Sequence, residues 1–159
     1  MRILSVGNLY PPHHFGGYEL IWRGAVEHLR DSGHEVRILT TDHRHRSPDP
    51  AIPEDRDCHR ELRWYWRDHR FPRLMPHARL RVERHNQRVL ERHLHEWRPD
   101  LVAWWPMGGM SMSLIEQCLL YSTRFFLEIA STPTKSRSSP TRRHASRTWG
   151  SRKIESMRQ

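Results

Sequence analysis

The first 41 residues alternate between strand and helix signals, and this alternation constrains the fold more than any other feature of the chain. Arg2–Gly7 is a short apolar run typical of a buried strand, and Glu35–Thr41 is a second β-rich run. Tyr18–Ser32 lies between them and reads as a helix, followed by Gly33 at the position of a left-handed cap. The apolar stripe of this helix is Leu20, Ile21, Ala25, Val26 and Leu29. Such a βαβ unit predicts two parallel strands with a helix on one face.

The same alternation continues along the chain. We expect a strand at Arg60–Trp66, a helix at His77–Trp97, a strand at Asp100–Trp105, a helix at Ser111–Tyr121 and a candidate strand at Thr123–Ile129. The side chains predicted to face the core on these helices and on the Arg60–Trp66 strand are Leu62, Trp64, Trp66, Leu80, Val89, Leu90, Leu94, Trp97, Leu114, Ile115, Cys118 and Leu119. Strands that alternate with helices predict an open, mainly parallel α/β sheet with flanking helices.

The positive charge of the chain is concentrated at its C-terminal end. The net charge is +9, but residues 131–159 carry eight Lys or Arg against one Glu, whereas residues 1–130 carry 19 basic and 17 acidic side chains. The C-terminal segment is also rich in Ser and poor in apolar residues, so it cannot offset the entropy of ordering. We therefore expect a folded domain at 1–122, an extra strand within 123–130 and a disordered basic tail at 131–159.

The near-neutral body argues against a specific nucleic-acid function, because only the tail offers a basic surface. Two cysteines form neither a disulfide framework nor a zinc set, and no run approaches the roughly 18 apolar residues of a membrane span. We expect a cytoplasmic protein with at most peripheral membrane contact.

Two glycine pairs, Gly16-Gly17 and Gly108-Gly109, fall where strands end and helices are about to begin. In open α/β sheets ligands bind outside the carboxyl ends of the strands. A glycine pair lets a group approach the backbone and leaves the first N–H groups of a helix open to an anion such as phosphate, although a plain structural turn is the alternative. Neither the G-x-G-x-x-G pattern nor a P-loop is present. The wide loop before Gly16 suits a sugar or a lipid headgroup.

Histidines are abundant, yet their sequence pattern does not indicate a metal. His43-x-His45 lies in a loop, His93-x-His95 points to different sides of a helix, and neither pair has Cys or carboxylate neighbours spaced for zinc. We expect no metal. His13 and His14 lie in the loop at the functional edge, where they could contact acceptor hydroxyls or phosphates or be simply solvated. Either Trp104 or Trp105 could stack on a sugar at the strand end, the alternative being a place in the core; Trp105 is our candidate for the stacking role.

The segment MRILSVGNLYPPHHFGGYEL, the later DSGHEVRILTT and the run RPDLVAWWPMGGMSMSLI together resemble a known family. Pro11-Pro12, Gly16-Gly17 and Gly33-His34-Glu35-Val36 match the N-terminal, acceptor-side domain of family 4 retaining glycosyltransferases of the GT-B fold, over about residues 1–120. The resemblance implies two Rossmann-like domains facing across a cleft, a nucleotide-sugar donor, a glycan or lipid acceptor, and no cofactor. It implies that Gly16 and Gly17 lie near the donor phosphates. The acceptor-cleft candidates are His13, His14, Trp105, Gly108 and Gly109.

The chain departs from that family pattern after the helix at Ser111–Tyr121. The donor domain with its paired Glu residues does not follow, and STRFFLEIASTPTKSRSSPTRR lacks the active-site histidine that the family often has there. We therefore expect a truncated or frameshifted hexosyltransferase-type chain with an incomplete sheet, inactive alone and with no assignable catalytic residue. The alternatives are a non-catalytic sugar- or phosphate-binding module working with a separate donor domain, and a nucleic-acid binder acting through the tail.

Overall fold

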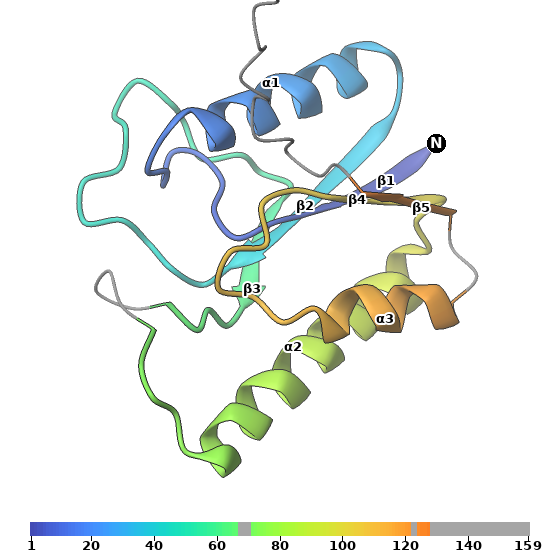
Figure 1. Cartoon of the computed structure of the whole chain (residues 1–159). Helices are drawn as coiled ribbons and strands as arrows, with labels where there is room; N and C mark the ends of the chain where they lie inside the picture. Colours follow the sequence, from blue (N-terminus) through green and yellow to red (C-terminus); the bar gives the residue numbers. More distant parts are fainter. Residues whose placement is uncertain (67–70, 122–123, 128–159) are drawn as a thin grey trace, which may run out of the picture.

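The computed structural model describes residues 1–66 and 71–121, and for residues 124–127 the backbone alone. The elements are β1 (Arg2–Val6), α1 (Gly17–Asp31), β2 (Glu35–Thr41), β3 (Cys58–Leu62), α2 (Pro76–Trp97), β4 (Leu101–Trp104), α3 (Ser113–Leu120) and β5 (Arg124–Leu127). They form one five-stranded sheet in the order β3-β2-β1-β4-β5, and every neighbouring pair is parallel. Helix α1 covers one face, while α2 and α3 lie on the other (Figure 1). The predicted Rossmann-like α/β fold is confirmed.

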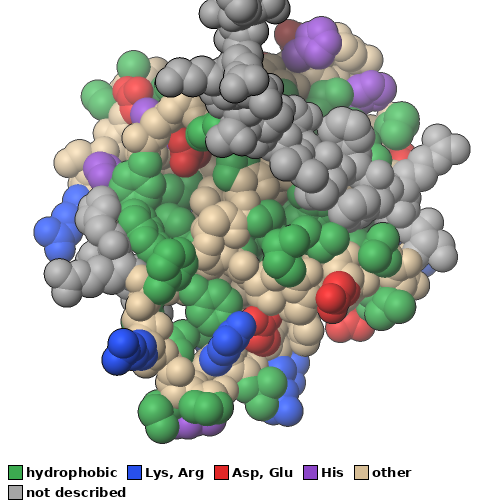
Figure 2. All heavy atoms as spheres, viewed as in Figure 1, with side chains coloured by type: hydrophobic (Ala, Val, Ile, Leu, Met, Phe, Trp, Pro, Cys, Tyr) green, Lys and Arg blue, Asp and Glu red, His purple; other side chains and the backbone are tan. Residues whose placement is uncertain are grey.

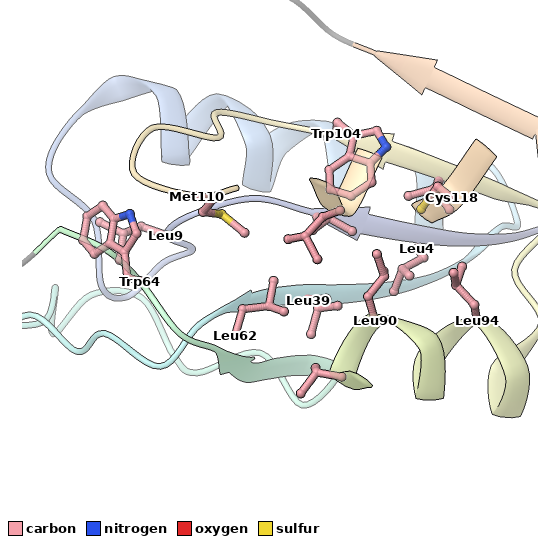
Figure 3. Close-up of a cluster of buried hydrophobic side chains, with 14 residues drawn as sticks. Leu4, Leu9, Leu39, Leu62, Trp64, Leu90, Leu94, Trp104, Met110 and Cys118 are labelled. Carbon is pink, nitrogen blue, oxygen red and sulfur yellow. The ribbon is translucent and has the colours of Figure 1, made fainter. Parts of the chain in front are cut away.

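Both faces of the sheet are buried, because helices cover each of them. Successive residues of β1 alternate between two apolar clusters, with Ile3 facing α1 and Leu4 facing α2. Figure 3 shows the larger cluster, in which Leu90 and Leu94 of α2 point toward Leu4 and Leu39 of the sheet. The smaller cluster is centred on Trp22 and Val26 of α1. Strand β5 extends the sheet beyond β4, inside the 123–130 segment expected to hold an extra strand. The expected tail at 131–159 lies outside the described residues.

The buried stripe of α1 differs from the predicted one. Leu20 and Ile21 are 42% and 63% exposed, whereas Trp22 is fully buried and Val26 packs one turn further along the helix. The reason is a specific contact, since the indole Nε1 of Trp22 donates a hydrogen bond to the Ser5 hydroxyl of β1 at 2.6 Å. The largest side chain of the helix therefore decides which face turns to the sheet.

Strand β3 ends at Leu62, four residues before the predicted end at Trp66. The fully buried Asn86 side chain of α2 forms hydrogen bonds with the backbone of Arg63, the residue that follows β3. Its Oδ1 accepts a hydrogen bond from the Arg63 N–H at 2.7 Å, and its Nδ2 donates to the Arg63 carbonyl at 2.9 Å. The Asn86 amide thus supplies the hydrogen bonds that a neighbouring strand would otherwise give to Arg63. The chain leaves the sheet at this point, and Trp64 stays buried.

Two further exposed leucines correct the predicted core. Leu80 is 47% exposed because the first turns of α2 extend beyond the sheet (Figure 1), and Leu119 is 62% exposed on the outer side of α3. Helix α3 begins at Ser113 rather than Ser111, although the Ser111 hydroxyl accepts a hydrogen bond from the Ser113 N–H. Among the described residues, no helix is long and apolar enough to cross a membrane.

Candidate functional site

The loops after β1, β2, β3 and β4 meet at the carboxyl edge of the sheet, where open α/β folds bind ligands. Asn8 joins the loop after β1 to the loop after β4 and to the end of strand β2. Its backbone N–H donates to the Pro106 carbonyl at 3.0 Å, its Nδ2 donates to the Gly108 carbonyl at 3.3 Å, and its own carbonyl accepts from the Thr40 hydroxyl at 2.8 Å. These contacts hold the loops after β1 and β4 side by side at the end of β2.

The proline loop is anchored from β3 by Arg60, a residue that sequence reasoning did not single out. The Arg60 side chain is 4% exposed, and its Nη2 donates to the carbonyls of Tyr10 and Pro11 at 2.8 and 3.1 Å. Its Nε donates to Glu54 at 2.7 Å. The Pro11-Pro12 peptide bond is cis. The buried guanidinium of Arg60 therefore holds the wide loop. This role depends on the Tyr10 and Pro11 carbonyls, which lie 50 and 49 positions earlier in the sequence.

His13 and His14 occupy different environments within this loop. His13 is 6% exposed, so the simple solvated reading is wrong for it, and its Nε2 lies 3.8 Å from Glu54. Burial, together with the nearby Arg60 charge, lowers the pKa of His13 and favours the neutral imidazole. His14 is more open, with Nε2 3.6 Å from Asp49.

Gly16 and Gly17 begin α1 and are both exposed. A Cβ built on either glycine would meet no described atom within 4 Å, so the space that a bulky ligand needs is open here. The Gly16 N–H donates to the Glu19 carboxylate at 3.2 Å, and Glu19 is 9% exposed. One N–H of the helix start is therefore already taken by an anion of the chain itself.

Among the described residues, five aromatic rings from three loops form an aromatic cluster beside the glycine pair. It consists of Phe15, His43, His45, Trp64 and Trp66. The Phe15 ring lies 5.3 Å from the Trp66 ring and 5.2 Å from the His45 ring, and Trp64 lies 4.8 Å from Trp66, all between ring centroids. Phe15 is 43% exposed. The cluster was missed from the sequence, where Trp64 and Trp66 were placed in a strand and the histidines in a remote loop.

The second glycine pair has a packing role that is visible in the geometry. Gly109 has φ +74°, and a Cβ there would lie 2.6 Å from the Trp64 Nε1 atom. That Nε1 donates to the Gly108 carbonyl at 2.7 Å. Gly109 therefore lets the loop after β4 pack closely against Trp64 of the aromatic cluster, whereas a Cβ at Gly108 would make only an ordinary contact, 3.6 Å from Asn8.

The tryptophans at the end of β4 both pack inward. Trp104 is fully buried in the core on the α2 side, so it does not offer a stacking face. Trp105 is partly buried on the α1 side, and its ring stacks on Trp22 with 5.9 Å between centroids and 17° between planes.

A hollow of about 790 Å³ adjoins this edge, between the segment after β3 and the loop before α3. Tyr65 lies in its wall and donates from its hydroxyl to Glu83 at 2.7 Å, and the Ser113 hydroxyl donates to the same carboxylate at 3.0 Å. Arg73 and Arg79 add positive charge. Figure 2 shows hydrophobic side chains beside Lys or Arg side chains over the N-terminal end of α2, where this hollow lies. Its volume and mixed lining suit a small polar ligand.

The comparisons with known proteins give one match. A family model described as "Glycosyl transferase 4-like domain" matches residues 16–154, whereas no curated protein and no solved structure matches. The match begins at Gly16 and so includes the Gly16-Gly17 pair and all three later loops of the carboxyl edge. It also continues past residue 120, where the resemblance was expected to stop, and enters the segment expected to be a tail. Most of the chain is thus covered, and the protein belongs to the family of glycosyl transferase 4-like domains.

Proposed function

We propose that this chain is the acceptor-binding part of a retaining glycosyltransferase, which moves a sugar from a nucleotide-sugar to an acceptor hydroxyl. The observation that carries the proposal is the juxtaposition at the carboxyl edge. An exposed glycine helix start, an aromatic cluster and a hollow of mixed polar and apolar lining come together from four loops of a glycosyl transferase 4-like domain.

Each part of the edge has a chemical role in this proposal. The Glu19 carboxylate takes the Gly16 N–H, so in this proposal the donor diphosphate meets the other N–H groups at the start of α1, from Gly17 onward, where stabilisation of the leaving group is needed. Phe15 and Trp66 receive the apolar C–H face of an acceptor sugar, while the hydroxyls at the ring edge find polar partners. His13 and His14 stay candidates for acceptor contact, and His14 is the more open of the two.

The donor-binding half of the cleft is supplied, in this proposal, by a further domain or a separate chain. The described residues offer one wall, so the 159-residue chain by itself is expected to bind saccharide weakly and to transfer nothing. Release or transfer of sugar from uridine- or guanosine-diphosphate sugars by the purified chain would contradict this part of the proposal.

Saccharide binding tests the aromatic cluster directly. We would titrate a panel of methyl glycosides into the full chain and follow tryptophan fluorescence and ligand-observed NMR. Phe15→Ala should weaken binding about two- to tenfold, the effect of losing one stacked ring. Leu120→Ala is the matched control, because Leu120 is 84% exposed on α3 away from this edge, and it should leave binding unchanged. Wild-type affinity in the Phe15 variant, or no binding of any glycoside by the wild type, would count against the proposal.

A further inference from the structure

A second cluster of chemically active side chains lies on edge strand β3, on the face covered by α2 and apart from the carboxyl-edge loops. His59 and Glu61 are two residues apart on β3, so both point to that face. His93 of α2 contacts both residues and is buried, with 4% of its side chain exposed. The His93 Nε2 atom lies 3.1 Å from Glu61 Oε2, and the His59 Nδ1 atom lies 3.5 Å from Glu61 Oε1.

Each nitrogen–oxygen separation is close to the spacing of neighbouring ligand atoms around a tetrahedral zinc ion, with the two histidines paired to different oxygens of Glu61. Bonds of about 2.0–2.1 Å at tetrahedral angles place neighbouring ligand atoms about 3.3–3.4 Å apart. One ligand atom from each of the three side chains lies within 4.8 Å of the other two. We propose that His59, Glu61 and His93 bind a zinc ion through two imidazole nitrogens and one carboxylate oxygen.

Accessibility fits a site with three protein ligands and an open fourth position. The side chains of His59 and Glu61 are each 33% exposed, so the ion has a path from solvent and room for a water ligand. A bound ion would join β3, at the edge of the described sheet, to α2 by coordination. The rings of His59 and His93 already lie 4.9 Å apart between centroids, so small side-chain shifts complete the site.

Two arginines compete with the ion. The Arg92 guanidinium contacts Glu61 Oε2, and the Arg37 Nη1 atom lies 3.5 Å from His93 Nδ1. A zinc ion bound to His93 Nε2 places the proton of the neutral imidazole on Nδ1. This N–H then faces the Arg37 guanidinium, which is also a hydrogen-bond donor. Arg92 is 49% exposed and can turn to solvent when the ion takes its place. Removing Arg92 should therefore strengthen zinc binding, a result that an unrelated surface histidine would not produce.

The sequence concealed this site because its ligands belong to two distant elements. The expectation of no metal considered His93-x-His95, yet His95 is 63% exposed and its Nε2 lies 3.9 Å from Glu91 instead. The partners of His93 stand 32 and 34 positions earlier, on a strand. No spacing along the chain connects them.

The experiment is a zinc titration of the full, tag-free chain by competition with a chromogenic chelator, together with Co²⁺ substitution read by visible absorption. We expect one zinc ion per chain and the intense visible bands of tetrahedral Co²⁺. His59→Ala and Glu61→Gln should each weaken zinc binding about tenfold or more and lose those bands. Both positions are partly exposed, so these variants keep the proposal testable if a His93 variant fails to fold.

Two control variants complete the test. His95→Ala, on the same helix, should bind zinc like the wild type, and Arg92→Ala should bind it about 1.5- to fivefold more tightly, as expected for loss of a competing ion pair. The proposal is overturned if the His59 and Glu61 variants keep wild-type affinity, if His95→Ala abolishes binding, or if the wild type binds no zinc.

Discussion

Asn86 is the residue whose replacement tests most directly how the carboxyl edge is built. Its two hydrogen bonds to the Arg63 backbone, at 2.7 and 2.9 Å, end β3 and send the chain toward the aromatic cluster. Asn86→Ala removes both. A lost hydrogen bond costs about 0.5–1.5 kcal/mol when water replaces the partner and about 1–3 kcal/mol when the partner stays buried and unpaired. Because Arg63 is half-buried, we expect one group of each kind and a loss of about 1.5–4.5 kcal/mol in the free energy of unfolding.

Urea unfolding followed by tryptophan fluorescence measures this loss, and the chain has seven tryptophans as reporters. Near-UV circular dichroism should also change, since Trp64 and Trp66 pack immediately after the residue that Asn86 holds. Arg88→Ala is the matched control on the exposed side of α2 and should change stability by less than about 0.5 kcal/mol. A loss below about 0.5 kcal/mol for Asn86→Ala, with an unchanged aromatic spectrum, would refute the reasoning.

Three further predictions concern packing, pH and thiol chemistry. Gly7→Ala would place a Cβ 2.7 Å from the Trp22 ring, so thermal unfolding should show a lower Tm by several degrees; an unchanged Tm would disprove the tight approach. Burial alone would raise the pKa of Asp55, but the Arg30 hydrogen bond at 2.6 Å and the neighbouring charges hold it below its usual value. A depressed carboxyl pKa stabilises the fold above the unfolded pKa of about 4, and this stability is lost as pH falls through the folded pKa; Asp55→Asn should flatten that acid limb in urea titrations at pH 2–6. Burial raises the pKa of both cysteine thiols to about 12, so iodoacetamide at pH 8 should modify them only after unfolding, and rapid labelling of the native protein, read by mass, would contradict this.

Local patterns predicted the elements but not always the face or the end of each one. The period of the α1 segment correctly indicated a helix, yet it could not tell that Trp22 rather than Ile21 faces the sheet, because the choice depends on the Ser5 hydroxyl of another strand. The alternation after residue 60 correctly indicated a strand, and its early end depends on Asn86, which comes 23 residues later than Arg63. Propensity is local, whereas these decisions belong to partners far along the chain.

The candidate site shows the same division. The position of the carboxyl-edge loops followed from the strand and helix order, because parallel strands must place their carboxyl ends together. The residues that line those loops could not be predicted from the order of the elements. Arg60 was only one residue of a predicted strand, and Phe15 and Trp66 were unrelated positions until the fold brought their rings within 5.3 Å.

The sequence by itself therefore determined the alternation of strands and helices, the parallel sheet and the two glycine pairs at its edge, because hydrophobic period and turn residues act over a few positions. Only the tertiary structure decided which indole packs against which strand, how the proline loop is held, and that His59, Glu61 and His93 converge. Those outcomes depend on side chains that the sheet brings together from separate elements. No regular separation along the sequence predicts such contacts.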